Sequence, residues 1–150
     1  MPTHEHGTRR PERPALLGLI AALSIAAGCA SSPDAQGSTT GSRDMMSDSG
    51  SLRVTLQSSP EATPVRGENQ IVLNVVQNES GDAVEGLTLS MVPFMPAMGH
   101  GSPVVPVFSD EGDGQYRFDD VDLTMAGLWE LRTAITGAVS DSVDFSFDVK

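Results

Sequence analysis

Methionine and histidine side chains gather in one short stretch of the sequence. Residues 95–102 read Met-Pro-Ala-Met-Gly-His-Gly-Ser, so two thioethers and an imidazole lie close together along the chain. Thioether sulfur is a soft ligand that suits Cu(I), and imidazole is also a good copper ligand. Met95, Met98 and His100 are therefore the candidate metal ligands, and Cu(I) is the candidate metal.

The spacing of these three residues requires a bent backbone. Residues share a face of a strand only when they are an even number of positions apart, which the 95, 98, 100 spacing does not satisfy. Pro96 and Gly99 favour a bend, because proline fixes φ and glycine tolerates positive φ. Met125 is the candidate fourth ligand from another part of the chain. Met91 alternates with the apolar residues before it, and we assign it to the core.

The same stretch also allows a purely structural interpretation. Methionine fills irregular gaps in cores, and a passage rich in proline and glycine between strands leaves such gaps. Under this second hypothesis, His100 bonds a backbone carbonyl and the methionines only shape a loop.

Enzymatic chemistry is not expected. The chain has three histidines, and two of them, His4 and His6, lie at the extreme N-terminus. A Ser-His-Asp arrangement in the remainder would have to use His100, and no G-x-S-x-G nucleophile motif is present. A structural zinc site would need more histidine or cysteine ligands than this region offers. The sequence thus predicts a protein that is not an enzyme and has no cofactor other than the candidate copper.

The N-terminus has the features of a bacterial lipoprotein leader. Three arginines within residues 9–13 precede an apolar run at 15–27, which is too short to span a bilayer comfortably. The following Ile-Ala-Ala-Gly-Cys resembles a lipobox, which implies cleavage of residues 1–28 and attachment of acyl chains such as palmitate to Cys29. Because Ala30 rather than aspartate follows the cysteine, we expect sorting to the outer membrane, with the protein facing the periplasm.

A linker is expected after the cysteine. Residues 30–50 are mostly Ser, Gly, Thr and Asp, with little apolar surface to offset the entropy of ordering the backbone. The predicted organisation is therefore a signal peptide at 1–28, a disordered linker at 29–50 that starts with lipidated Cys29, and a folded domain at 51–150.

Apolar and polar residues alternate repeatedly in that domain, and helical periodicity is absent. Turn-forming residues separate the alternating segments, which is typical of an antiparallel β-sandwich. We expect a hairpin loop at 109–114 and a connection at 119–126. The pattern predicts an all-β, immunoglobulin-like sandwich of about seven strands, with a small Greek-key barrel as the alternative. The predicted strands are 52–57, 71–76, 87–91, 104–108, 116–118, 129–135 and 143–149.

The charge of the chain excludes some partners. Its 20 acidic and 9 basic residues give a formal net charge of −11. Nucleic acids and anionic membrane surfaces both reward Lys and Arg, so neither is an expected electrostatic partner. The predicted membrane contact is the lipid anchor at Cys29.

Three segments taken together resemble the YtkA-like domain. They are Met-Pro-Ala-Met-Gly-His-Gly at 95–101, Gly-Gln-Tyr at 114–116 and Met-Ala-Gly-Leu-Trp-Glu-Leu at 125–131, within a likeness that covers roughly 52–149. The resemblance implies an extracytoplasmic, immunoglobulin-like sandwich that is often tethered to a membrane. The related FixH-like proteins imply a link to copper supply for respiratory oxidases. Those proteins carry a transmembrane helix where this chain has a lipobox, so an oxidase-assembly role is not carried over.

Two functional hypotheses follow. The first is a lipid-anchored periplasmic copper carrier or buffer that uses Met95, Met98 and His100, with Met125 as fourth ligand. The second is an envelope protein–protein interaction module in which the Met/His stretch is structural.

Overall fold

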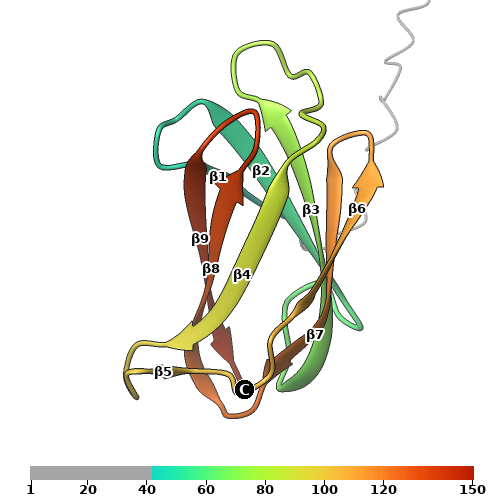
Figure 1. The fold of residues 1–150 in the computed structure, drawn as a ribbon. Coiled ribbons are helices and arrows are strands. Elements are labelled where there is room, and N and C mark those ends of the chain that lie inside the picture. Colours follow the sequence, from blue (N-terminus) through green and yellow to red (C-terminus); the bar gives the residue numbers. More distant parts are fainter. Residues whose placement is uncertain (1–41) are drawn as a thin grey trace, which may run out of the picture. The chain divides into compact units, whose positions relative to one another are not determined.

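The computed structural model describes residues 42–150, which form strands and connections (Figure 1). The predicted signal peptide at 1–28, Cys29 and the linker up to residue 41 lie outside the described residues. The predicted all-β class is confirmed, with nine strands where about seven were expected. The strands are β1 (Arg43–Met46), β2 (Leu52–Ser59), β3 (Gly67–Gln77), β4 (Thr88–Met95), β5 (His100–Gly101), β6 (Val107–Gly112), β7 (Gln115–Leu123), β8 (Gly127–Thr136) and β9 (Asp141–Val149).

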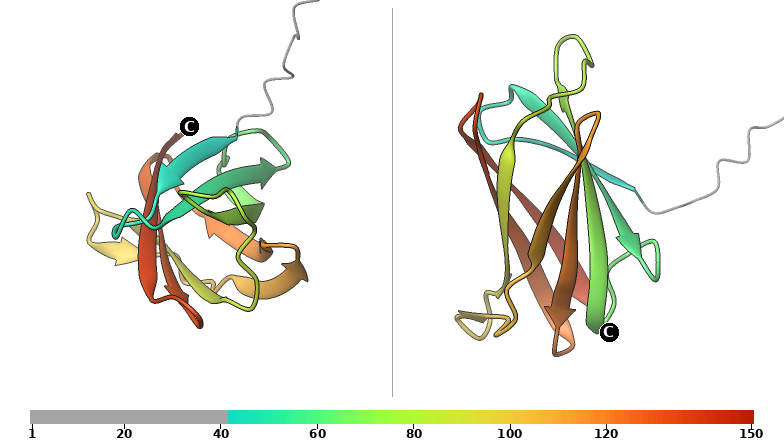
Figure 2. Two further views of the ribbon diagram at one scale, coloured as in Figure 1. Left: turned by 90° about the horizontal axis from the view of Figure 1, so that it is seen from above. Right: turned by 45° about the vertical axis from the view of Figure 1, so that its right-hand side comes forward.

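The strands form two antiparallel sheets that pack face to face (Figures 1 and 2). One sheet has the order β1-β2-β3-β7-β6 and the other has the order β5-β4-β8-β9. All strand pairs within both sheets are antiparallel. The predicted immunoglobulin-like sandwich is therefore confirmed.

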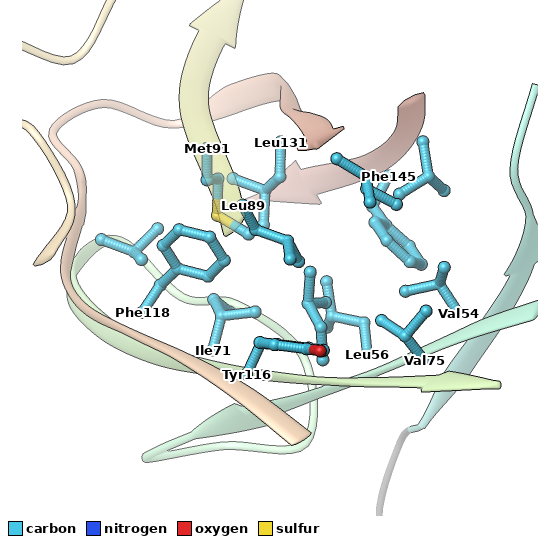
Figure 3. Close-up of a cluster of buried hydrophobic side chains, with 14 of the residues drawn as sticks. Val54, Leu56, Ile71, Val75, Leu89, Met91, Tyr116, Phe118, Leu131 and Phe145 are labelled. Carbon is cyan, nitrogen blue, oxygen red and sulfur yellow. The ribbon is translucent and has the colours of Figure 1, made fainter. Parts of the chain in front are cut away.

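The core lies between the two sheets and is built from alternate residues of the long strands (Figure 3). Strand β9 illustrates the rule, because Val143, Phe145, Phe147 and Val149 are buried while the residues between them are mostly exposed. The prediction that Met91 belongs to the core is confirmed, since it is 4% exposed. In Figure 3 its sulfur lies among buried aliphatic and aromatic side chains.

A buried tyrosine ties the connection between β3 and β4 to β7. The hydroxyl of Tyr116 donates to the Val84 carbonyl at 2.7 Å and accepts from the Leu87 N–H at 3.1 Å. Burial raises the pKa of the Tyr116 phenol above its ordinary value. Two backbone groups of an irregular segment thus find partners inside the protein.

Strand β1 corrects the predicted boundary of the domain. The linker was predicted to run to residue 50, yet Arg43–Met46 pair with β2, with Arg43 opposite Leu56. The Arg43 guanidinium lies 4.6 Å from the centre of the Phe147 ring and bonds the Ser146 carbonyl. The prediction of disorder is therefore wrong for residues 43–46, because pairing with β2 and contacts of Arg43 offset their lack of buried apolar surface.

Strands β6 and β7 also differ from the prediction. The structure places β6 at Val107–Gly112 rather than 104–108, so most of the predicted hairpin loop at 109–114 is strand. Likewise, β7 continues to Leu123 through residues predicted to be a connection. The backbone at Asp120 has φ of +56°, and the register between β3 and β7 shifts near this point. This bulge moves the buried positions from even to odd numbers, which hides the strand from a search for simple alternation.

The two ends of the sandwich carry different connections (Figure 1). We call the end that carries β5 the hairpin end, and it contains connections 60–66, 96–99, 102–106 and 124–126. We call the opposite end the turn end, and it contains connections 47–51, 78–87, 113–114 and 137–140. The candidate ligands all lie at the hairpin end.

Candidate metal site

Strands β4 and β5 form a hairpin that places two of the predicted ligands side by side. Met95 is the last residue of β4, and it lies directly opposite His100, the first residue of β5. Directly opposed residues of an antiparallel pair point to the same face, with Cβ atoms about 4.5–5.5 Å apart. Pairing across the hairpin therefore brings together two residues that are five positions apart in the sequence.

The predicted bend between them is confirmed. The N–H groups of Met98 and Gly99 donate to the Met95 carbonyl at 3.1 and 3.0 Å, which closes a turn over residues 96–99. Gly99 has φ of +69°, a conformation that favours glycine. A side chain at Gly101 would begin 2.7 Å from the Pro93 carbonyl oxygen, so the second glycine allows close approach of the two strands.

The three predicted ligands differ in their access to solvent. Met98 lies on the turn and is 58% exposed, and His100 is also exposed. Met95 is only 6% exposed and belongs to the core cluster. Two of the three donors are therefore open to an incoming ion, while the third is directed into the protein.

The buried side chain of Met95 ends at the start of β8. Its methyl carbon lies 2.6 Å from the point that a Cβ at residue 127 would occupy, and Gly127 has φ of +132°. The absence of a side chain at Gly127 leaves the space that the end of Met95 fills. The thioether thus bridges from the end of β4 to the first residue of β8, close to the surface at the hairpin end.

Met125 lies in the connection that leads into β8, two residues before Gly127. Its side chain is partly buried and packs against the core, and its carbonyl accepts the indole N–H of Trp129 at 2.9 Å. Trp129 itself is fully buried, so this bond fixes the backbone of the connection. Met125 is therefore at the same end as the hairpin but is engaged in packing.

The imidazole of His100 has one contact with the backbone. Its Nδ1 lies 3.1 Å from the carbonyl oxygen of Gly101. A metal-ligating histidine commonly directs one ring nitrogen to a carbonyl and presents the other to the metal. The contact is also the one that the structural hypothesis predicts, so it agrees with both hypotheses.

The hairpin itself carries no charged side chain. Residues 86–109 contain no Asp, Glu, Lys or Arg. A charged pair lies on the neighbouring strand β8, where the Arg132 guanidinium lies 3.8 Å from the centre of the Phe94 ring and bonds Glu130 at 2.7 Å. Within residues 42–150, no group of three or more His, Cys, Asp or Glu side chains is positioned to hold a metal ion. The candidate donors on the hairpin itself are thus thioethers and one imidazole.

Sequence reasoning did not identify two residues that shape this site. Gly127 determines where Met95 can go, and the Met-Ala-Gly order before Trp129 was the only signal for it. Phe94 supports Arg132 beside the hairpin, and nothing in the spacing of these two residues indicates that contact.

Comparisons with known proteins agree with this description of the domain. A search against protein families matches residues 46–134 to the YtkA-like family. The chain therefore belongs to the YtkA-like family, as its three motif segments indicated. A comparison with curated proteins finds no significant match.

Among solved structures, the chain is similar to the crystal structure of a DUF4426 family protein from Pseudomonas aeruginosa PAO1. The two share 9% sequence identity with a TM-score of 0.45, over 73% of this chain and 94% of that chain. Within residues 42–150, no helix is both long and apolar enough to cross a membrane.

Proposed function

We propose that this chain is a non-enzymatic, lipid-anchored protein of the bacterial envelope that carries or buffers Cu(I) at the hairpin end. The anchor would be Cys29, placed by the lipobox-like sequence before it, with the domain facing the periplasm from the outer membrane. The copper ligands would be Met98, His100 and Met95, with Met125 as a fourth.

One observation supports the copper proposal most strongly. Met95 and His100 are directly opposed across the hairpin, and Met98 stands on the turn between them. Three soft or borderline donors thus come from one compact element, and two of them are exposed. The donor set fits Cu(I) better than zinc, calcium or magnesium, which prefer nitrogen, thiolate or oxygen ligands.

The ligand set would be completed by a movement of Met95. Its side chain is buried, and its methyl carbon lies beside Gly127. Methionine has three flexible side-chain bonds and repacks easily, so a rotamer change could bring its sulfur toward the imidazole. His100 would bind through Nε2 while Nδ1 keeps its contact with Gly101. A site on an exposed turn suits exchange of the ion with another carrier.

The second candidate function is an envelope interaction module. It is favoured by the burial of Met95 in the core and by the contact of His100 with a backbone carbonyl. Under this proposal the hairpin is a rigid surface feature, and replacing its methionine and histidine would leave copper affinity unchanged.

A copper titration separates the two proposals. Residues 29–150, which include all nine described strands, would be titrated with Cu(I) against a competing chelator. Cys29 is replaced by alanine in every sample, because a free thiolate would itself bind Cu(I). We expect Met98→Leu and His100→Ala each to weaken binding at least about tenfold, which corresponds to about 1.4 kcal/mol.

Met45→Leu is the matched control, because Met45 is an exposed methionine on β1, outside the hairpin end. It should leave the affinity unchanged. Micromolar or weaker binding that neither hairpin substitution alters would reject the copper proposal and favour the interaction module.

A further inference from the structure

The methionines of the folded domain differ widely in their exposure to solvent. Within residues 42–150, the exposed methionines are Met45 at 40%, Met46 at 57% and Met98 at 58%. Met91 and Met95 are only 4% and 6% exposed. A reagent dissolved in water therefore reaches the thioether of Met98 directly, whereas the side chain of Met95, on the same hairpin, is enclosed by the protein.

The characteristic covalent reaction of an exposed thioether is oxidation to the sulfoxide. With a peroxide, a lone pair of the sulfur attacks one oxygen, an S–O bond forms and the O–O bond breaks. The sulfur loses two electrons to the peroxide, and the proton of the transferred oxygen passes to the leaving hydroxide, so the second product is water. Sulfoxide reductases reverse the change with two electrons and two protons, and they release the oxygen as water.

We propose that Met98 is a site of regulatory oxidation, where a peroxide converts the thioether to the sulfoxide and the hairpin then releases Cu(I). This inference rests on the proposed function, because it takes Met98 as a copper ligand. It adds a reversible modification to that site, and it names a peroxide as the class of reagent that acts there.

Oxidation removes the property that suits Met98 to Cu(I). The sulfur of a sulfoxide is poor in electrons and its oxygen is a hard donor, whereas Cu(I) prefers soft sulfur ligands. The other proposed thioethers are shielded, because Met95 is buried and Met125 is partly buried. His100 keeps its imidazole. The proposed site therefore loses one of its four donors, and its affinity for Cu(I) falls.

The turn that carries Met98 does not depend on its side chain. Backbone N–H groups of Met98 and Gly99 close the turn by donating to the Met95 carbonyl. An added oxygen on an exposed side chain meets water, so we expect the sandwich to stay folded after oxidation. The same oxygen on Met91 or Met95 would be buried in the apolar core, which is unfavourable without a partner. Exposure thus directs the reaction to a position where the fold tolerates it.

Oxidation of individual methionines tests the first step. Residues 29–150 with Cys29→Ala are treated with hydrogen peroxide in the absence of copper. The peroxide is then destroyed with catalase, and fragmentation mass spectrometry locates each added oxygen. We expect Met98 to be oxidised at least about tenfold faster than Met95.

Met46 is the matched control for this reaction, because it has nearly the same exposure as Met98 but lies on β1, outside the hairpin end. The two should be oxidised at similar rates in the metal-free protein. Saturating Ag(I), a soft ion used here in place of Cu(I) because it is not a source of Cu(I)-driven radicals, should slow oxidation at Met98 and leave Met46 unchanged.

A Cu(I) titration against a competing chelator tests the second step. Oxidation should weaken Cu(I) binding at least about tenfold, and treatment with sulfoxide reductases should restore it. Met98→Gln places a polar group at this position, so it should bind as weakly as the oxidised protein and lose little more affinity after peroxide treatment. Met46→Gln should behave like the unchanged protein. Circular dichroism should show that the oxidised domain is still folded.

Different results would reject this proposal and the proposed function. Oxidation of Met98 no faster than that of Met95, equal effects of Ag(I) on Met98 and Met46, or unfolding of the oxidised domain would overturn the inference. Cu(I) binding that is equally strong before and after oxidation of Met98 would also overturn it, while the copper proposal stands. Absence of Cu(I) binding before oxidation would instead reject the proposed function and this inference with it.

Discussion

The hydroxyl of Thr133 is a buried polar group in an apolar environment. Thr133 is 1% exposed, and within residues 42–150 its Oγ1 has no hydrogen-bond partner. Its neighbours in register are Met91 on β4 and Val143 on β9, which are both buried and apolar. Burying a hydroxyl without a partner is unfavourable, because its bonds to water are lost and not replaced.

Replacing this hydroxyl with a methyl group should stabilise the protein. We expect Thr133→Val to raise the free energy of unfolding by about 1 kcal/mol, because valine has nearly the same shape and needs no partner. Urea denaturation of residues 29–150 measures the change. Thr136→Val on the same strand is the control, because Thr136 donates to the Thr88 carbonyl at 3.0 Å and should gain nothing. A less stable Thr133→Val variant would show that the hydroxyl has a partner after all.

At the residue scale, the sequence indicated the candidate ligands but not their directions. Met95, Met98 and His100 were found from their types, and the bend between them from Pro96 and Gly99. Burial of Met95 could not be predicted in this way, because it depends on the absence of a side chain at one position of another strand. That position, at Gly127, is 32 residues away in the sequence.

At the scale of elements, the turn between β1 and β2 is fastened to the start of β9 by Asp141. The carboxylate accepts the N–H groups of Ser142 at 2.9 Å and Ser49 at 3.1 Å. The hydroxyls of Ser49 and Ser51 also bond it, at 2.5 and 3.3 Å. The two edge strands β1 and β9 belong to different sheets, so this contact helps to hold the sheets together along one side.

These hydrogen bonds favour the ionised carboxylate. Partial desolvation acts to raise the pKa of Asp141, but hydrogen bonds from the hydroxyls of Ser47 and Ser49 and from the N–H groups of Ser142 and Ser49 outweigh it. The pKa of Asp141 is therefore held well below its ordinary value. A lowered pKa in the folded state gives stability that is present above the unfolded value of about 3.9 and is lost as the pH falls below it.

Removing this charge should change how stability depends on pH. We expect Asp141→Asn to cost about 1 kcal/mol at pH 7, a figure discounted for the partial exposure of the site. The difference from the unchanged protein should shrink as the pH falls from about 5 to about 2, because the unfolded carboxylate gains its proton over this range while the native one stays largely ionised. Urea unfolding at a series of pH values measures both effects.

Asp148→Asn is the matched control, because it removes the same charge from an exposed position on the same strand. A stability difference for Asp141→Asn that stays constant over this pH range would contradict the explanation.

Alternation of apolar and polar residues predicted the positions of some strands well and of others poorly. Strands β2, β8 and β9 alternate without interruption, and their positions were predicted closely. Strand β7 was truncated in the prediction, because the bulge at Asp120 changes which positions face the core. Strands β1 and β5 were missed because they bury little apolar surface of their own and depend on pairing with a neighbour.

At the scale of the whole molecule, the two-sheet sandwich followed from repeated alternation, since several amphipathic strands must bury their apolar faces against each other. The order of strands within the sheets did not follow, because contacts such as that between β3 and β7 join segments far apart in the sequence. The structure brings the candidate ligands to one end of the sandwich, and neither this placement nor their exposure to solvent could be predicted from the sequence.

The proposed anchor also belongs to this scale, because it determines where the molecule is. We expect metabolic labelling with a radioactive or clickable fatty acid to mark the chain, and Cys29→Ala to abolish the label and leave a precursor of higher mass. Loss of residues 1–28 from the unchanged protein, measured by mass spectrometry, would accompany the label. Unchanged labelling of the Cys29→Ala variant would rule out acylation at this cysteine.

The contact between Met95 and Gly127 has a consequence for the evolution of this domain. The methyl end of Met95 occupies the volume that any side chain at position 127 would need. A larger residue at 127 would be strained by the backbone φ of +132°, and it would also require a shorter side chain at 95 or a methionine turned outward toward position 100. Across relatives, the identities at positions 95 and 127 should consequently change together. In a relative without this glycine, loss of the methionine at position 95 would show that it serves packing. Retention of the methionine would show that it serves a role at the surface.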